Sequence, residues 1–285
     1  MKRKIGEGAE GEIFVAWDEG FKRDVAIKFQ RAQTFESPET YVDDGRLIEQ
    51  EYDRLGVVLD VPGIPRVFDK GSFGISNRRF LVMELIDGVT VASWISAHQP
   101  VPAAAALSAI GQLCEILGGL HAKEYVHRDV TPNNTMLQPD GRVRLLDVGI
   151  SVMAGELNAY PGGSPGYAAP EQYDRTVALT PQADVFALGV LLFEMVAARL
   201  PYSGLERPLD DRASAFPKDF RAEMPETLRS LGLAMVSVDP RERPNGVAEV
   251  LRLLQPMLPA AGSPASPKAT RPDPTAPYRL GLAVP

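Results

Sequence analysis

The segment 127–134, which reads HRDVTPNN, places an acidic and an amide side chain in one polar stretch after an apolar run. Asp129 offers a carboxylate that can accept or orient the proton of a hydroxyl group. Asn134 offers a neutral oxygen of the kind that binds a metal ion. A structural turn rarely combines His, Arg, Asp and Asn at this spacing, so the segment predicts a catalytic loop.

A second carboxylate follows after the strand-like run 143–146. Asp147 is succeeded by Val148 and Gly149. A carboxylate at the end of a strand suits Mg²⁺, because this ion takes hard oxygen ligands and retains several waters. An isolated Asp-x-Gly is more often simply a turn, so this assignment depends on the neighbouring motifs.

The N-terminal segment 6–11 reads GEGAEG and lies between two predicted strands. Glycines without β-carbons allow backbone amides to approach phosphate oxygens closely, although the same residues also occur in ordinary turns. A Rossmann phosphate loop is disfavoured, because a strand and not a helix follows.

Lys28 ends the apolar run 25–28, where its ammonium group could reach the phosphates of a nucleotide. An exposed lysine at a strand end is the alternative interpretation. A buried lysine requires an acidic partner, and Glu51 on the next predicted helix is suitably placed. Glu49 is the rival partner, but it faces elsewhere.

These residues require strands in the first part of the chain and helices in the second. Glycine-punctuated, partly alternating apolar residues predict two or three strands within 4–29 and a further strand at 79–86. Helical periodicity predicts one helix at 46–59, and then long helices at 103–123, 184–199, 225–238 and 247–254. Residues 259–285 are rich in Pro, Ala, Ser and Thr, so we expect a disordered tail.

Composition excludes several classes of protein. One cysteine and three histidines among 285 residues exclude a disulfide framework and a Cys/His metal cluster. The net charge of −7 argues against a nucleic-acid partner. No signal peptide is evident, and the run 185–200 is too short and too acidic at Glu194 to cross a membrane. We therefore expect a cytoplasmic protein without membrane partners.

Three further segments have recognisable patterns: GSPGYAAPE at 163–171, a buried helix beginning at Asp184, and DPRERP at 239–244. Together with the loops described above, and in the same order, they resemble the eukaryotic-type (Hanks-type) Ser/Thr protein kinase family, and the chain is similar to its bacterial members. The resemblance covers residues 6 to 243.

The resemblance implies an α+β, bilobal fold with a small antiparallel β-rich lobe, containing one main helix, and a larger helical lobe. The kinase domain would span residues 1–258, divided into lobes of 1–86 and 87–258, with the tail at 259–285. The implied activity is transfer of the γ-phosphoryl group of ATP, with Mg²⁺, to Ser or Thr of protein substrates. Autophosphorylation of the tail at Ser263, Ser266, Thr270 or Thr275 is a further hypothesis.

The resemblance also assigns roles to individual residues. It implies catalytic roles for Asp129, Lys28 and Glu51, and metal binding by Asn134 and Asp147. The residues expected to bind ATP are Gly6, Glu7, Gly8, Ala9, Glu10, Gly11, Ile13, Ala26, Lys28, Met83, Glu84, Ile86, Asn134 and Asp147. The backbones of Glu84 and Ile86 would contact adenine. Arg243 and Glu171 would form a buried, bidentate ion pair that anchors the peptide-binding segment.

The chain departs from the family pattern at two positions. Thr131 stands where a lysine usually neutralises the transferring phosphoryl group, a loss on the order of 2 to 4 kcal/mol of transition-state stabilisation. Val148 replaces a phenylalanine, which leaves a smaller contact beneath the helix that carries Glu51. These departures keep a pseudokinase scaffold open as an alternative function. A small-molecule phosphotransferase, which would share the Asp…Asn and Asp-x-Gly elements, is a second alternative.

The segment between Ser151 and Ser164 contains no Ser or Thr, and Tyr160 is its one hydroxyl-bearing residue. We therefore expect an activity that does not depend on phosphorylation of this loop. Ser164 is expected to contact Asp129.

Overall fold

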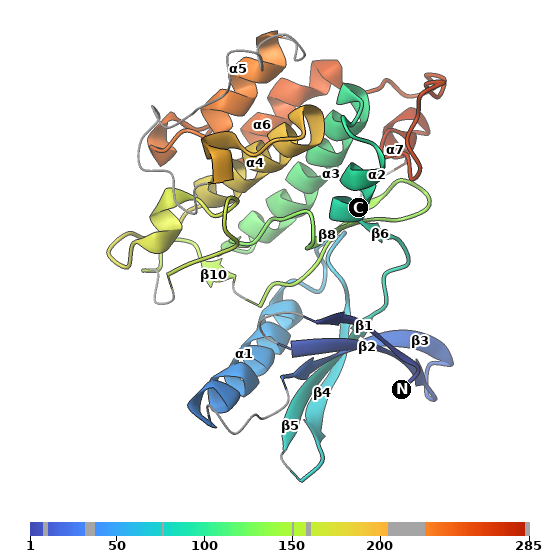
Figure 1. The fold of residues 1–285 in the computed structure, drawn as a ribbon, viewed down its shortest axis with the longest axis vertical. Helices are drawn as coiled ribbons and strands as arrows, with labels where there is room; N and C mark the ends of the chain where they lie inside the picture. The colour runs from blue at the N-terminus through green and yellow to red at the C-terminus, as the bar shows by residue number, and fades with distance from the viewer. Residues whose placement is uncertain are drawn as a thin grey trace. The chain divides into compact units, whose positions relative to one another are not determined.

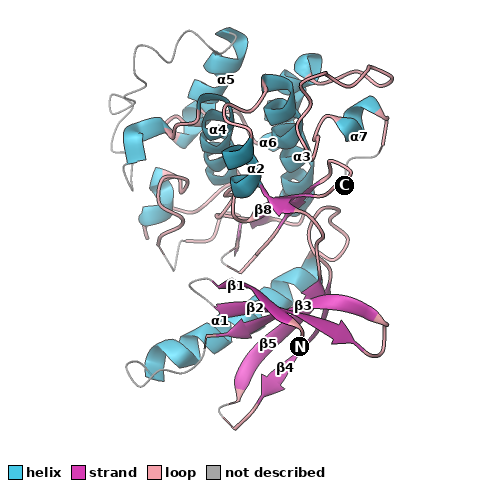
Figure 2. Cartoon of the chain, turned by 45° about the vertical axis from the view of Figure 1, so that its right-hand side comes forward, coloured by secondary structure: helices cyan, strands magenta, loops and turns pink. Residues whose placement is uncertain are grey.

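The computed structural model describes residues 1–7, 11–31, 38–75, 77–149, 151–157, 161–204 and 226–282. The chain divides into two compact units. The first comprises Met1–Asp87 and Asp147–Ile150, and the second comprises Gly88–Leu146 and Ser151–Pro285. Strands dominate the first unit and helices the second (Figure 1, Figure 2), so the predicted α+β organisation is confirmed.

The first unit is an antiparallel sheet of five strands in the order β1-β2-β3-β5-β4. Their bounds are β1 (Arg3–Glu7), β2 (Gly11–Asp18), β3 (Arg23–Gln30), β4 (Val67–Phe73) and β5 (Arg78–Glu84). The helix α1 (Pro38–Val57) packs on β3, β4 and β5 and turns Ile48, Leu55 and Glu51 inward. The predicted strands at 4–29 and 79–86 are thus present, and β4 is additional. The helix predicted at 46–59 is also present, but it begins at Pro38 and ends at Val57.

Three helices form the centre of the second unit. They are α3 (Ala103–Ala122), α4 (Gln182–Ala197) and α6 (Val247–Leu254), and α3 packs against both of the others. Because α3 and α4 are apolar on nearly every side, they are stable only when surrounded by protein. Around them lie α2 (Val91–Ala97), α5 (Glu226–Met235) and the short 3₁₀ helices η1 (Pro170–Tyr173), η2 (Pro201–Gly204), η5 (Pro240–Glu242) and η6 (Gln255–Met257).

Among the described residues, α3 is the one helix long and apolar enough to cross a membrane by length and composition. Most of it is buried inside the second unit, as in the core helix of a globular domain. The run 185–200 singled out in the sequence lies largely in α4, whose side chains are also buried.

Short β-ladders shape the loops of the second unit. One sheet has the order β6-β8-β9, formed by β6 (Val89–Thr90), β8 (Thr135–Leu137) and β9 (Val143–Leu145). A second ladder pairs β7 (Tyr125–Val126) with β10 (Val152–Met153). The catalytic segment predicted from the sequence connects β7 to β8, so both of its ends are fixed by strand pairing.

The prediction of a disordered C-terminal tail is wrong for residues 259–282. This segment lies on the second unit and includes α7 (Ala276–Arg279), drawn in red beside α2 and α3 (Figure 1). Trp94 Nε1 donates to the Pro272 carbonyl at 3.1 Å, and Gln112 Nε2 donates to the Pro274 carbonyl at 3.0 Å. Side chains of α2 and α3 thus hold the segment in place through its backbone carbonyls. Such contacts do not require apolar residues at regular spacing in the segment, so its sequence showed no sign of order.

Candidate active site

Lys28 is buried on β3 and faces two carboxylates. Its Nζ lies 2.7 Å from Glu51 Oε2 and 3.1 Å from Asp147 Oδ2. The side chains of Lys28 and Glu51 are 5% and 2% exposed, so this is a buried ion pair, as predicted. The rival Glu49 instead pairs with Arg79 at 3.3 Å near the surface. Desolvated charges of this kind persist only when their partners are close and well oriented.

The segment after Asp147 is tied to α1 by an arginine that the sequence did not single out. Arg54 donates to the Gly149 carbonyl, and the Gly149 amide donates to Asp147 Oδ1 at 3.0 Å. Asp147 has a φ of 57°, a left-handed conformation that is uncommon for a residue other than glycine. Val148 is 1% exposed, so the smaller side chain at this position is still fully packed.

In the second unit, Asp184 binds the backbone of the predicted catalytic loop at its start. Its Oδ1 accepts from the Arg128 amide, and its Oδ2 accepts from the His127 amide and from His121 Nε2, each at 2.8 Å. Burial acts to raise the pKa of Asp184, but the hydrogen bond from His121 and the neighbouring imidazole and amide groups outweigh it, so this pKa is lowered. Asp184 therefore stays ionised while completely buried.

The strained turn at Arg128 is fixed from its other side as well. Arg128 has a φ of 72°, and its carbonyl accepts from Gln172 Nε2 at 2.9 Å. His127 Nδ1 accepts from the Asp129 amide at 3.3 Å, which leaves His127 Nε2 to donate to the Leu146 carbonyl at 3.1 Å. A backbone conformation of this kind is kept only where several surrounding contacts fix it, and such positions are common at functional sites.

Asp129 presents its carboxylate to two polar groups at once. Its Oδ2 accepts from Asn134 Nδ2 and its Oδ1 accepts from Ser164 Oγ, both at 2.6 Å. The predicted contact between Ser164 and Asp129 is confirmed. With its Nδ2 committed to Asp129, Asn134 would meet a cation through its Oδ1. The Asp129 carboxylate thus binds the hydroxyl of a serine in the structure, which is the kind of group that a general base acts on, and the Asn134 amide lies beside it.

Thr131 has a structural task of its own. Its Oγ1 accepts from the Asn134 amide at 3.2 Å, and its carbonyl accepts from Thr135 Oγ1 at 2.8 Å. Thr131 is 4% exposed, so its hydroxyl closes the loop from inside. Hydroxyl side chains commonly satisfy backbone amides a few residues further along in this way.

Arg243 and Glu171 form the predicted buried, bidentate pair. Arg243 Nη1 lies 2.6 Å from Glu171 Oε1, and Nη2 lies 2.9 Å from Oε2. The remaining donors of Arg243 bind the carbonyls of Ser237, Gln182 and Val238. Through these contacts Arg243 connects η1, which follows the segment 163–169, to the first residue of α4 and to the loop after α5.

A family model described as "Protein kinase domain" matches residues 1–254. The chain belongs to the protein kinase family. Among similar curated proteins, the serine/threonine-protein kinase PrkC of Bacillus subtilis is 29% identical over 233 residues, covering 80% of this chain and 34% of PrkC. The serine/threonine-protein kinase PknB of Mycolicibacterium smegmatis is 30% identical over 208 residues, covering 70% of this chain and 32% of PknB.

A probable serine/threonine-protein kinase PknB of Lactococcus lactis is 26% identical over 260 residues, covering 87% of this chain and 40% of that protein. The chain thus spans only about a third of the length of the curated relatives it matches. The remainder of each relative lies outside the alignment.

The glycine segment of this kinase domain lies at the turn between β1 and β2. Gly6 and Glu7 end β1, Gly11 begins β2, and Ile13 is half-buried two residues further on. Residues Gly8, Ala9 and Glu10 lie outside the described residues. A β-carbon on Gly11 would overlap the Phe29 carbonyl, so this glycine is required for strand packing whatever it binds.

The predicted adenine-contacting residues end the strand β5 and follow it. Ala26 on β3 is 6% exposed and pairs with Met83 on β5. The Glu84 amide donates to the Arg66 carbonyl at 2.8 Å. Any contact from the Glu84 backbone to an adenine would therefore come from its carbonyl. Ile86, at the end of the first unit, lies beyond the last strand residue and is 9% exposed.

The segment 151–164 is described in part. Ser151 is 1% exposed, and Tyr160 lies outside the described residues. Arg128 Nη2 donates to the Gly162 carbonyl at 3.3 Å, so a backbone group of this segment meets its guanidinium. Whether phosphorylation of the segment matters stays a prediction.

Several positioning residues were not found from the sequence, chiefly Arg54, His121 and Gln172. Arg54 lies three residues after Glu51 on one face of α1, and Gln172 directly follows Glu171, so both stood next to residues that were identified. Arg54 and Gln172 bind backbone carbonyls and His121 binds the carboxylate of Asp184, and none of these contacts produces a pattern of residue types at a fixed spacing.

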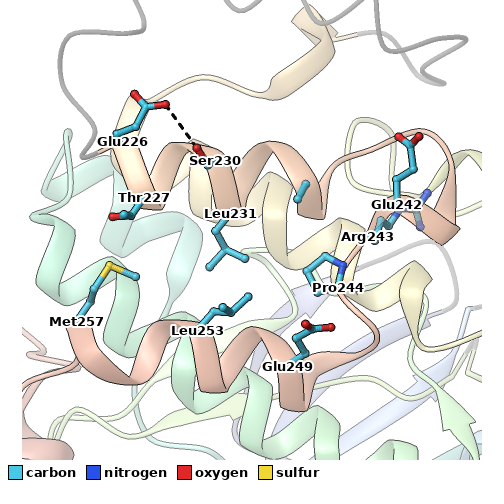
Figure 3. Close-up of a pocket in the computed structure, with 11 residues that line it drawn as sticks. Glu226, Thr227, Ser230, Leu231, Glu242, Arg243, Pro244, Glu249, Leu253 and Met257 are labelled. Atoms are coloured by element: carbon cyan, nitrogen blue, oxygen red, sulfur yellow. Dashed lines mark hydrogen bonds between the residues drawn. The ribbon is translucent and has the colours of Figure 1, made fainter.

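A separate pocket of about 650 Å³ lies between α5 and α6 (Figure 3). Leu231, Leu253 and Met257 form its apolar side, and Glu226 and Glu249 lie at its rim. Arg243 lines it, but none of the residues predicted to act in catalysis or to bind ATP or metal does, so we assign it no part in the chemistry of Asp129 or Lys28.

Proposed function

We propose that this protein is an ATP-dependent protein kinase that phosphorylates Ser or Thr hydroxyls of protein substrates. The observation that carries the proposal is the buried ammonium of Lys28 between Glu51 and Asp147, at 2.7 and 3.1 Å. A cation held in this way on a sheet is the phosphate-orienting group of protein kinases. Membership of the family and the named relatives support the same activity.

Each residue then has a defined task. Lys28 contacts phosphate oxygens of ATP, and Glu51 keeps its ammonium in position. Asp129 accepts the proton of the substrate hydroxyl through the carboxylate that binds Ser164 Oγ in the structure. The hydroxyl oxygen forms a bond to the γ-phosphorus, the bond from that phosphorus to the bridging oxygen breaks, and ADP leaves.

The donor groups fit Mg²⁺ better than a metal that prefers a dedicated protein cage. Among the described residues, no cluster of three or more His, Cys, Asp or Glu side chains is placed to hold a metal ion. Mg²⁺ commonly binds through one or two carboxylates together with substrate phosphates and water. Asp147 and Asn134 would hold it, and it would supply positive charge against the phosphate oxygens.

A protein substrate is favoured over a small molecule by the Arg243–Glu171 pair. This largely buried pair holds the end of the segment 163–171, which would form the platform for an extended peptide. A small-molecule phosphotransferase has no need of such a platform. The substrate protein, autophosphorylation, a signalling role and a cytoplasmic location belong to the proposal and rest on sequence and family alone.

The first experiment measures phosphate transfer from labelled ATP with Mg²⁺ to a generic basic protein. Lys28→Met and Asp129→Asn are expected to lower the rate by at least about 100-fold, since each removes a group that acts on the transition state. Glu49→Gln is the matched control, because it removes a carboxylate from the same helix that pairs with Arg79 instead.

Transfer to protein that both catalytic variants abolish and Glu49→Gln retains would establish the proposed function. ATP binding without any transfer would favour a pseudokinase, which Thr131 keeps open. Transfer to small alcohols or amines but never to protein would favour the small-molecule enzyme.

A further inference from the structure

The C-terminal segment 259–282, here called the strap, lies beyond the part of the chain that matches the family. Its own contacts make it compact. Asp273 Oδ2 lies 2.8 Å from Arg279 Nη2, and Asp273 Oδ1 accepts from Thr275 Oγ1 at 2.6 Å. The Gly262 amide donates to the Arg279 carbonyl at 2.7 Å, which closes the strap on itself. Such a set of internal bonds holds one conformation that can dock.

One buried side chain joins the strap to the β8–β9 hairpin, which follows the predicted catalytic loop. Gln112 on α3 is 0% exposed, and its Nε2 donates to the carbonyls of Pro274 and Gly141, each at 3.0 Å. Its Oε1 accepts from the Val143 amide at 2.8 Å. A buried amide with both of its ends occupied is a strong positional constraint, because losing any partner leaves a desolvated polar group.

Gly141 and Val143 belong to the turn and second strand of the β8–β9 hairpin. The opposite end of this hairpin carries the proposed chemistry: Asn134 directly precedes β8, and its carbonyl accepts from the Leu146 amide at 2.7 Å. The four residue-to-residue steps from Asn134 to Gln138 extend over about 13 Å. A constraint on the turn is thus transmitted along a short, hydrogen-bonded ladder.

Glycine is required where the strap meets this turn. A β-carbon on Gly141, whose φ is +87°, would overlap the Asp273 carbonyl of the strap. A β-carbon on Gly111 of α3 would lie 2.6 Å from the Tyr278 hydroxyl. The strap therefore packs its backbone directly on the hairpin turn and its Tyr278 side chain on α3.

We propose that the strap and Gln112 act as a positioning device for Asn134, by fixing the β8–β9 hairpin at its turn. This rests on the proposed function in so far as Asn134 holds Mg²⁺. Gln112 and the strap do not touch substrate or metal themselves. Releasing the strap would move or loosen Asn134 and weaken Mg²⁺ binding, although every ligand remains present.

The burial of two strap hydroxyls bears on the tail phosphorylation considered above. Thr270 and Thr275 are 4% and 9% exposed, and both hydroxyls are hydrogen-bonded. Ser266, by contrast, is exposed. In the docked strap, Ser266 is therefore accessible to a kinase, whereas the hydroxyl groups of the two threonines are covered.

The test compares Gly141→Ala with Gly74→Ala in the full chain. Both glycines lie in hairpin turns at positive φ, +87° and +74°, but only Gly141 has the strap above it, whereas Gly74 has open space. Two readouts are used: hydrogen exchange of the amides of residues 135–146, and the Mg²⁺ concentration that gives half of the maximal phosphotransfer rate.

Gly141→Ala should speed exchange in the hairpin and raise the half-saturating Mg²⁺ concentration by about 10-fold, as expected when a supporting group of a metal ligand is lost. Gly74→Ala should change neither. Arg279→Met, which breaks the ion pair inside the strap and leaves the hairpin sequence intact, should give a smaller effect of the same kind.

A purely stabilising strap would lower the fraction of active protein and leave the half-saturating Mg²⁺ concentration unchanged in Gly141→Ala and Arg279→Met, which overturns the proposal. If the unaltered chain transfers no phosphate, the proposed function fails, and hydrogen exchange alone decides. Unchanged exchange of residues 135–146 in both variants then rejects the strap as a positioning device.

Discussion

Lys28 keeps its charge inside the first unit because two carboxylates face its ammonium, and of these Glu51 is the more buried. The Glu51 side chain is 2% exposed and that of Asp147 is 36% exposed, so Glu51 is the partner shielded from solvent. Removing one partner of a buried ion pair leaves an uncompensated charge, which is strongly destabilising. The contact with Glu51 is therefore the one whose loss should disturb the ammonium of Lys28 most.

Replacing Glu51 by Gln should lower kcat/KM for ATP by about 10-fold to 100-fold, because Lys28 loses its nearer anchor and its ammonium can turn toward Asp147 alone. Steady-state kinetics of phosphate transfer would measure the change. Glu49→Gln, from the same helix, should leave kcat/KM within about 2-fold. Equal losses in the two variants would show that the charge of α1, and not the contact with Lys28, matters.

Thr131 stands where the family usually has a lysine. Its side chain is nevertheless buried, and its hydroxyl accepts a hydrogen bond from the Asn134 amide. The variant Thr131→Val keeps the shape and removes the acceptor. It should lower the free energy of unfolding by about 1 to 2 kcal/mol, because a buried amide loses its partner.

Urea unfolding would measure this loss, with Thr176→Val as the control, since the Thr176 hydroxyl is hydrogen-bonded to Asp174 at an exposed site. If both valine variants unfold at the same urea concentration, Thr131 has no structural role in the loop.

At the scale of secondary-structure elements, the sequence predicted what depends on periodicity. The helix α6 was predicted at 247–254, which are its observed bounds, and the ends of α3 and α4 differ by no more than two residues. In α3 and α4 the apolar residues occupy nearly every face, so these helices are stable because the surrounding protein buries them. The buried Lys28–Glu51 pair was predicted because a buried cation needs an acidic partner, and the Arg243–Glu171 pair was predicted from the family resemblance.

Elements without a periodic pattern were missed. The strand β4 contains Asp69, Lys70 and Gly71, and it lies at the edge of its sheet, where polar residues are tolerated. The helix α2 has seven residues and begins with Thr90 as its cap, too short for a periodic signal. The strap was missed because its contacts run from Trp94 and Gln112 to backbone carbonyls.

Arg243 joins three elements through one guanidinium. It binds both oxygens of Glu171 and the carbonyls of residues in α4 and in the loop after α5. Arg243→Lys keeps the charge but cannot reproduce the planar fork, so it should lower the free energy of unfolding by about 2 to 4 kcal/mol.

Thermal and urea unfolding would measure the Arg243→Lys effect, and Arg241→Lys is the matched control. Arg241 lies two residues away, is 88% exposed and pairs with Asp239. Its replacement should leave the unfolding midpoint close to that of the unaltered chain. A comparable loss in the control would mean that the turn itself is sensitive and that the buried pair is not the cause.

For the molecule as a whole, the folded second unit extends past the end of the family match at residue 254. Residues up to 282 pack on α2, α3 and the β8–β9 turn. Tyr278 of the strap lies beside Glu115 of α3, and burial raises the pKa of both groups. The strap therefore adds a titratable group to the buried part of the unit.

Carboxyl groups act on stability in opposite directions as the pH changes. Hydrogen bonds from Lys4 and Arg78 lower the pKa of Glu12, and a hydrogen bond from Arg241 lowers the pKa of Asp239 to about 2. The pKa of Asp184 is lowered too. Because these groups bind protons less readily in the folded state, the stability they give is present above their ordinary pKa near 4 and is lost on acidification.

Glu115 and Glu194 have the opposite sign, since burial raises the pKa of each above 4.5. Their contribution is present below 4.5 and is lost as the pH rises through their folded-state pKa values. Replacing Glu194 by Gln should therefore flatten the decline of stability above pH 4.5 while leaving the acid side unchanged. The Tyr167 hydroxyl, which donates to Glu194 Oε2 at 2.6 Å, can donate to the amide oxygen instead.

Urea unfolding midpoints between pH 3 and 9 would measure this, with Glu49→Gln as the control that removes a more exposed carboxylate. The difference between Glu194→Gln and the unaltered chain should favour the variant increasingly as the pH rises, because only the unaltered chain must ionise the half-buried carboxyl group of residue 194. A constant difference across the whole range would mean that Glu194 contributes through packing and not through its charge, and the tilt of the stability curve would then have to come from Glu115 beneath the strap.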